Sequence, residues 1–301
     1  MAVQYATTRY TTTFTGDTKA NICAGVEAAL NAAGWSTISG HGTTDMVLQT
    51  GTTSQGYALR AHFKDNGGTC IQVSMVTTDG AKASTVGTAY GASLLPGVAK
   101  VWQIVANPYQ FVLWVPGDST VAREFCLFSC PYVPSFFLPM PQYIGILHTN
   151  TLSDSSTDDP QNNFRYSAVD WGQNAAPNFV CLFGTSIWEN ANNRWNNSNY
   201  PSMPLFVTPI SAWGGNANVT AGSERFYRYQ NGNLFSMDAM LAWGLTAFGD
   251  EPKVACQLWD ALLICGPFAM DTVTAFDTHN WVCITDSNTS QTKVSLWIAT
   301  S

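Results

Sequence analysis

Pairs of carboxylates are the first residues in this chain that could do chemistry, because a glycosidase needs two of them facing each other across a sugar bond. The sequence leaves two pairings open, Glu189 with Asp170 and Glu224 with Asp238. Any chain with twenty acidic residues offers such pairs, so the pattern does not single out an active site. A glycan-cleaving enzyme is therefore the weakest of the functions that we weigh.

Metal-binding residues lie at unfavourable spacings. Cys126 and Cys130 are four residues apart and lack the second pair of ligands that zinc requires. Three acidic residues in one loop (Asp154, Asp158 and Asp159) do not follow the EF-hand spacing and are typical of a solvated acidic loop. The histidines are scattered, so we expect them in turns or on the surface: His41, His62, His148 and His279.

Nucleophile and cofactor motifs are missing from the sequence. It contains no GxSxG elbow, no phosphate-binding loop and no dinucleotide fingerprint. The eight cysteines are expected to be buried free thiols, because the first fourteen residues do not resemble a secretion signal. We therefore expect no catalytic residue, no metal and no cofactor, and a protein that is not an enzyme.

Charge is scarce and unevenly placed. Charged residues make up 11% of the chain, against roughly 25% in typical soluble domains. Residues 1–150 hold seven basic and seven acidic side chains, whereas residues 151–301 hold six and thirteen. No basic cluster occurs, so we expect no binding to nucleic acid. A surface with few charges tolerates being packed against other protein.

Residues 125–147 form a run without any charged side chain. Four prolines within eleven residues of this run exclude a membrane-spanning helix and favour an extended path. An extended segment cannot bury its own large side chains, so five of them need another apolar surface: Phe136, Phe137, Leu138, Met140 and Tyr143. That surface belongs either to the same chain or to a neighbouring subunit, and we take these five as candidate interface residues.

An asparagine-rich stretch, residues 188–201, carries three aromatic side chains, Trp188, Trp195 and Tyr200. Aromatic rings stack on sugar rings while amides bond to hydroxyl groups, so the stretch suits a glycan. The same composition also suits a contact between subunits or a plain surface loop.

Helical spacing is clear in one segment, near residues 18–33, which Asp17 or Thr18 can cap and Gly34 can end. Most other segments read as strands and hairpins, with a tight reversal at Asn107-Pro108-Tyr109. In the first half they fall at 45–50, 56–63, 69–76, 101–106, 110–115 and 123–129. In the second half they fall at 179–183, 205–210, 226–229, 254–258, 262–265, 281–285 and 293–299.

These elements predict an α+β fold that is mostly β. An N-terminal helix packs on an antiparallel sheet, and a β-sandwich-like second half follows. We expect an α+β domain over residues 1–145 and a mainly β domain over 146–301 that ends in a hairpin.

The order of elements, together with several short motifs, resembles a group of virion structural proteins of tailed bacteriophages that are associated with the tail. The motifs are Ala-Ala-Gly-Trp at 32–35, Ala-Asn-Pro-Tyr-Gln-Phe at 106–111, Cys-Pro-Tyr-Val-Pro at 130–134, Gln-Leu-Trp-Asp-Ala at 257–261 and a Trp-rich terminal hairpin. The resemblance implies a non-enzymatic building block that works in many copies. Its partners would be copies of itself and other virion proteins.

The first hypothesis is therefore a structural subunit of the tail, baseplate or fibre-attachment region, assembled in the host cytoplasm and located in the virion. The second is a carbohydrate-binding or receptor-binding module of the tail that contacts a host surface glycan. Neither hypothesis involves insertion into a membrane.

Overall fold

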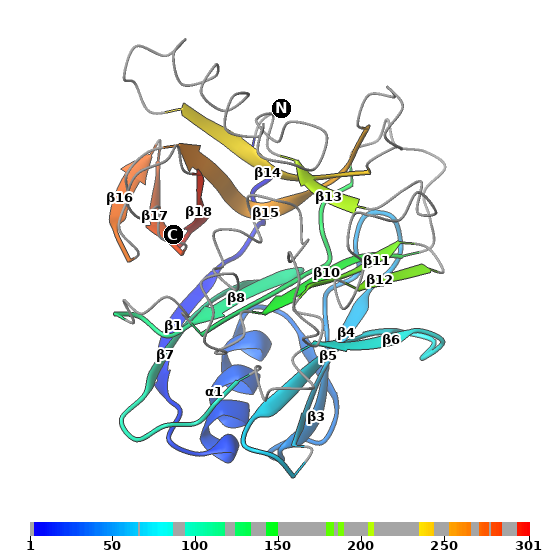
Figure 1. The fold of residues 1–301 in the computed structure, drawn as a ribbon, viewed down its shortest axis with the longest axis vertical. Helices are drawn as coiled ribbons and strands as arrows, with labels where there is room; N and C mark the ends of the chain where they lie inside the picture. The colour runs from blue at the N-terminus through cyan, green and yellow to red at the C-terminus, as the bar shows by residue number, and fades with distance from the viewer. Residues whose placement is uncertain are drawn as a thin grey trace, which may run out of the picture.

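The computed structural model describes most of the N-terminal half and separate parts of the C-terminal half. The described residues are 3–65, 67–86, 94–117, 124–133, 143–149, 179–183, 186–189, 204–207, 235–243, 253–265, 271–276, 278–284 and 294–301. Within these ranges one α-helix and eighteen β-strands form three sheets, in which all strand pairs are antiparallel (Figure 1).

The helix α1 (Lys19–Ala32) begins and ends at the expected places. Thr18 is its N-cap, and the Thr18 side chain accepts a hydrogen bond of 3.1 Å from the amide of Asn21. Gly34 follows with φ +98°, which L-residues with side chains rarely adopt. The helix near residues 18–33 is thus confirmed.

The central sheet has seven strands in the order β1-β7-β8-β9-β10-β11-β12. Their bounds are β1 (Tyr10–Thr15), β7 (Val101–Asn107), β8 (Gln110–Trp114), β9 (Phe125–Ser129), β10 (Ile144–Thr149), β11 (Phe179–Phe183) and β12 (Ser186–Glu189). The reversal predicted around Pro108 is the turn of the β7–β8 hairpin, in which Asn107 pairs with Gln110. Strand β1 joins the sheet through β7, which lies about 90 residues further along the chain.

A second sheet has five strands in the sequential order β2 to β6. Their bounds are β2 (Ser36–Ser39), β3 (Asp45–Gln49), β4 (Leu59–Asp65), β5 (Ile71–Thr77) and β6 (Ala83–Val86). Every second residue of β5 is buried, as expected of a strand with one face on a core.

The third sheet has six strands in the order β13-β14-β15-β18-β17-β16. Their bounds are β13 (Pro204–Val207), β14 (Phe235–Trp243), β15 (Lys253–Cys265), β18 (Val294–Ala299), β17 (His279–Cys283) and β16 (Val273–Phe276). The expected terminal hairpin is confirmed as β17 paired with β18. The two strands predicted at 254–258 and 262–265 are one strand, β15, while the strand predicted at 226–229 lies outside the described residues.

The sheets form layers (Figure 1). The six-stranded sheet lies on one side of the central sheet, and α1 and the five-stranded sheet lie on the other. One cluster of buried apolar residues joins all three sheets, from Ile22 in α1 to Ile298 in β18. The α+β fold, mostly β with a sandwich-like second half, is confirmed.

The expected division at residues 145/146 stays a prediction. Strands β11 and β12 lie beyond it in the chain and still extend the central sheet, since β11 pairs with β10. Both ends of the uncharged run 125–147 also lie in this sheet, as β9 and β10. None of the helices among the described residues is long and apolar enough to span a membrane.

Candidate functional site

Tyr143 is the one predicted interface residue whose side chain is described. It is buried, and its ring packs edge-on against Tyr57, with the ring centres 6.0 Å apart. Its hydroxyl lies 3.3 Å from Oγ1 of Thr78, and the Tyr57 hydroxyl donates to the carbonyl of Ile144 at 3.2 Å. Tyr143 therefore packs on its own chain, and its contact with another subunit stays a prediction.

The side chains of the other predicted interface and glycan-contact residues lie outside the described part of the structure. The candidate interface residues Phe136, Phe137, Leu138 and Met140 lie outside the described residues, as do Trp195 and Tyr200 of the glycan stretch. The backbone of Trp188 lies in β12 opposite Cys181, and its side chain is not described. The glycan contact and the apolar arm both stay predictions.

Six cysteines confirm the expectation of buried free thiols: Cys23, Cys70, Cys126, Cys130, Cys256 and Cys283. Burial raises the pKa of Cys130 to about 12, and burial with nearby Asp65 and Glu27 raises the pKa of Cys23 to about 12. The Cys23 and Cys130 thiols therefore stay protonated at neutral pH and are poor nucleophiles and poor metal ligands. Within the described residues, no three His, Cys, Asp or Glu side chains lie together as metal ligands do.

Strand β1 is an edge strand whose composition suits contact with another protein. It ends the strand order of the central sheet, so β7 is its partner on one side and the described strands supply none on the other. Its sequence, YTTTFT, holds no charge, proline or glycine. Natural edge strands usually carry charges, prolines or bulges that prevent pairing with another chain, and β1 has none of these.

The hydrogen-bond alternation shows which backbone groups of β1 face outward. The amide of Gly16 donates to the carbonyl of Lys100 at 2.8 Å, in the same register that pairs β1 with β7. Tyr10, Thr12 and Phe14 share this phase and bond to β7. The N–H and C=O groups of Thr11, Thr13 and Thr15 therefore point away from the sheet. All three of these threonines are exposed.

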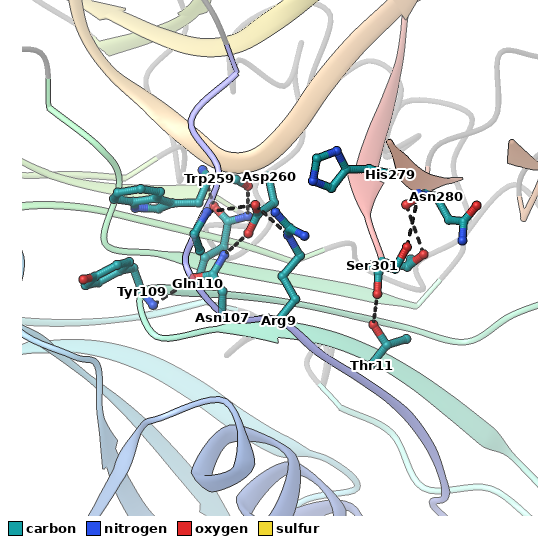
Figure 2. A network of polar contacts seen from close by, with 12 residues as sticks. Arg9, Thr11, Asn107, Tyr109, Gln110, Trp259, Asp260, His279, Asn280 and Ser301 are labelled. Atoms are coloured by element: carbon teal, nitrogen blue, oxygen red, sulfur yellow. Dashed lines mark hydrogen bonds and ion pairs between the residues drawn. The ribbon is translucent and has the colours of Figure 1, made fainter. Parts of the chain in front are cut away.

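A buried ion pair anchors the start of β1 (Figure 2). Nε of Arg9 lies 2.7 Å from Oδ1 of Asp260, with side-chain exposures of 12% and 1%. Oδ1 also accepts from the Ala6 amide at 3.0 Å, while Oδ2 accepts from Nδ2 of Asn107 at 2.6 Å. Residues from β7, β15 and the segment before β1 thus meet at one carboxylate.

Burial raises the pKa of Asp260, and the Arg9 guanidinium with these hydrogen bonds offsets only part of that rise. The backbone at Asp260 has φ +52°, a conformation that Asp and Asn adopt more readily than most residues. Asp260 lies between Gln257 and Leu262, where the pairing of β15 with β14 shifts register, and its carboxylate contacts Arg9 and Asn107.

Aromatic stacking and a hydrogen bond to a C-terminal residue also hold the start of β1 in place. The Arg9 guanidinium lies 5.2 Å from the centre of the Tyr5 ring, which stacks on His279 at 4.2 Å. Thr11 Oγ1 donates to the carbonyl of Thr300 at 3.0 Å, near the contacts of Asn280 with the C-terminal residues (Figure 2).

Two glycines fix the other end of β1. Gly16 is buried against Trp102, and a Cβ at Gly16 would lie 2.4 Å from that indole ring. Phe14 packs on α1 at Gly25, where a Cβ would lie 2.3 Å from the Phe14 ring. The strand is therefore held at both ends and on one face, and no described strand pairs with its outer edge.

Exposed apolar side chains lie next to this edge. Tyr10 begins β1, and Val101 pairs with Thr15 on the neighbouring strand; both are exposed. Val98, in the turn before β7, is 97% exposed. We call the outer edge of β1 with these three residues the β1 edge.

The sequence carries a signal for strand β1, which was not among the predicted strands. Residues 10–15 are β-branched or aromatic throughout, which favours a strand. Its edge position could not be inferred, because that depends on pairing with β7 and on the strand order.

No protein-family model matches this chain, and no curated protein matches its sequence.

Proposed function

We propose that this protein is a structural subunit that acts by protein–protein assembly. The observation that carries the proposal is the β1 edge, which is uncharged, is anchored by the Arg9–Asp260 ion pair and has no partner among the described strands beyond β7. An edge of this kind adds a strand from another chain at little conformational cost, since it is ordered before binding.

The resemblance to tail-associated virion proteins gives the assembly a setting. We propose a place in the tail, baseplate or fibre-attachment region of a bacteriophage virion. The partners would be copies of this chain and other virion proteins. The low charge of the chain suits a subunit that is surrounded by other protein.

Light scattering coupled to size-exclusion chromatography tests the proposal. At tens of micromolar we expect a mass that is a multiple of 32.6 kDa. Because the β1 edge lacks charges, this mass should be unchanged between 50 and 500 mM NaCl. A protein that stays monomeric at 100 micromolar and binds no other virion protein would contradict the proposal.

A further inference from the structure

We infer that two copies of this chain pair through β1, antiparallel and about a two-fold axis at Thr13, to form one continuous sheet. The inference rests on the proposed assembly function and names the partner of the β1 edge as a second copy. It follows from the order of backbone groups, side chains and charges along residues 9–17.

The backbone permits this register. Antiparallel strands exchange hydrogen bonds between residues whose N–H and C=O groups point toward each other. The outward residues are Thr11, Thr13 and Thr15. With the axis at Thr13, that residue meets the partner's Thr13, and Thr11 meets the partner's Thr15. The three pairs that result use every outward backbone group of β1.

Thr13 has an acceptor ready for such a bond. A hydrogen bond from Thr12 Oγ1 reaches the Thr13 carbonyl at 3.4 Å, which is long for an O–H donor. An amide from a second copy would offer that carbonyl a shorter and better aligned bond.

The side chains agree with the same register. Threonines opposite one another form favourable cross-strand pairs. Thr12 would lie beside the partner's Phe14, an aromatic with a β-branched residue, which is also favourable. Tyr10 would lie opposite the partner's Gly16, next to the Trp102 indole that already covers that glycine.

The charges that flank β1 favour the antiparallel direction. Arg9 precedes the strand and Asp17 follows it. Antiparallel pairing about Thr13 keeps the exposed Asp17 of the two copies apart, each at the end where the other copy has its Arg9–Asp260 ion pair. Parallel pairing would set Asp17 near Asp17, which is unfavourable.

The helix α1 gives the second copy a further surface. It packs on the face of β1 that carries Phe14, and a two-fold axis perpendicular to the sheet places both copies of α1 on that same face. Its exposed residues are all uncharged: Ala20, Asn21, Ala24, Ala28, Asn31 and Ala32. Small side chains let two helices approach closely, so the alanines suit a contact across the axis.

Cysteine cross-linking tests the register. Paired residues of this type have Cα atoms about 5.5 Å apart, within the reach of a disulfide. We expect Thr13→Cys to form a disulfide-linked dimer under mild oxidation. Thr15→Cys alone should not, because the two copies of residue 15 would be separated by four residues, about 13 Å. A mixture of Thr11→Cys and Thr15→Cys proteins should cross-link, with the natural chain as the background control.

Charge substitution tests the same axis without cysteine. Thr13→Lys and Thr13→Asp each place like charges opposite one another, so each should weaken the dimer about fivefold. An equimolar mixture should restore a dimer. Ser36→Lys, an exposed residue of the edge strand β2, is the matched control and should leave the mass unchanged. Circular dichroism should show that all variants fold.

The outcomes separate this inference from the proposed function. If Thr13→Lys leaves the mass of the oligomer unchanged and Thr13→Cys does not cross-link it, the β1 pairing is wrong. The proposed assembly function is then still supported, because the protein is an oligomer. Self-cross-linking of Thr15→Cys overturns the register. A monomer at all concentrations, without a Thr13→Cys cross-link, overturns both.

Discussion

At the scale of single residues, Glu27 is a buried carboxylate that ties α1 to the turn between β2 and β3. Its Oε1 lies 2.8 Å from Nδ1 of His41 and accepts from Thr37 Oγ1 at 2.8 Å. Its Oε2 accepts from the amide of Gly42 at 3.1 Å. Burial raises the pKa of Glu27, but these hydrogen bonds outweigh burial, so the pKa lies below its ordinary 4.5.

A lowered pKa makes Glu27 a source of stability that depends on pH. The stabilisation is complete above the ordinary pKa and is lost as pH falls through the lowered one. We expect Glu27→Gln to lower the free energy of unfolding by about 1–2 kcal/mol at pH 7, because bonds to a charged acceptor are lost. Urea denaturation at pH 7 and pH 3 should show the difference from the natural chain shrinking at the lower pH. An equal difference at both would refute this role for Glu27.

The ion pair of Arg9 with Asp260 makes a second prediction at this scale. Asp260→Asn keeps the backbone tolerance for positive φ and leaves the Arg9 charge buried without its partner. Breaking a buried ion pair in this way costs about 3–5 kcal/mol. Arg9→Met in the same chain removes the stranded charge and should recover more than half of the loss. A urea double-mutant cycle measures this, and single variants whose effects simply add would contradict it.

At the scale of elements, the contact between α1 and β1 depends on Gly25. Replacing a mid-helix glycine by alanine normally stabilises a helix by about 1 kcal/mol. Here the new Cβ would lie 2.3 Å from the Phe14 ring, and overpacking of this kind costs about 1–3 kcal/mol. We therefore expect Gly25→Ala to destabilise the protein.

The matched variants separate packing from helix propensity. Phe14→Leu combined with Gly25→Ala should recover stability, since the smaller side chain leaves room. Ala28→Gly, on the exposed face of α1, should cost about 1 kcal/mol through propensity alone. Thermal denaturation gives the melting temperature of each variant. A Gly25→Ala protein with a higher melting temperature than the natural chain would show that the contact between Gly25 and Phe14 has room for a methyl group.

Local patterns predicted α1 and most strands, because their signals lie within a few residues. The cap at Thr18, the stop at Gly34 and the turn at Pro108 are of this kind. Pattern reading divided β15 in two because Asp260 interrupts its apolar residues. The Asp260 side chain pairs with Arg9, some 250 residues earlier in the chain. A pattern within a few residues of Asp260 carries no information about so distant a partner.

The candidate site was less predictable than the fold. The apolar arm and the glycan stretch stood out by composition, whereas β1 is an ordinary run of threonines. What makes β1 a candidate is its place at the end of the central sheet, beside β7. Sheet order depends on pairing between distant segments, and periodicity within a segment does not report it.

At the scale of the whole molecule, the shared core predicts how the protein unfolds. One apolar cluster contains residues of α1, of the five-stranded and central sheets, and of β15, β17 and β18. Layers that share a core lose their packing together, so we expect a single cooperative transition. Hydrogen exchange in increasing urea should show β3 to β5 and β17 to β18 losing protection at the same concentration. Asp260→Asn should lower both midpoints equally, because its ion pair joins these layers. Early loss in β17 and β18, with residues 1–145 still protected, would instead support two domains that divide at residue 145.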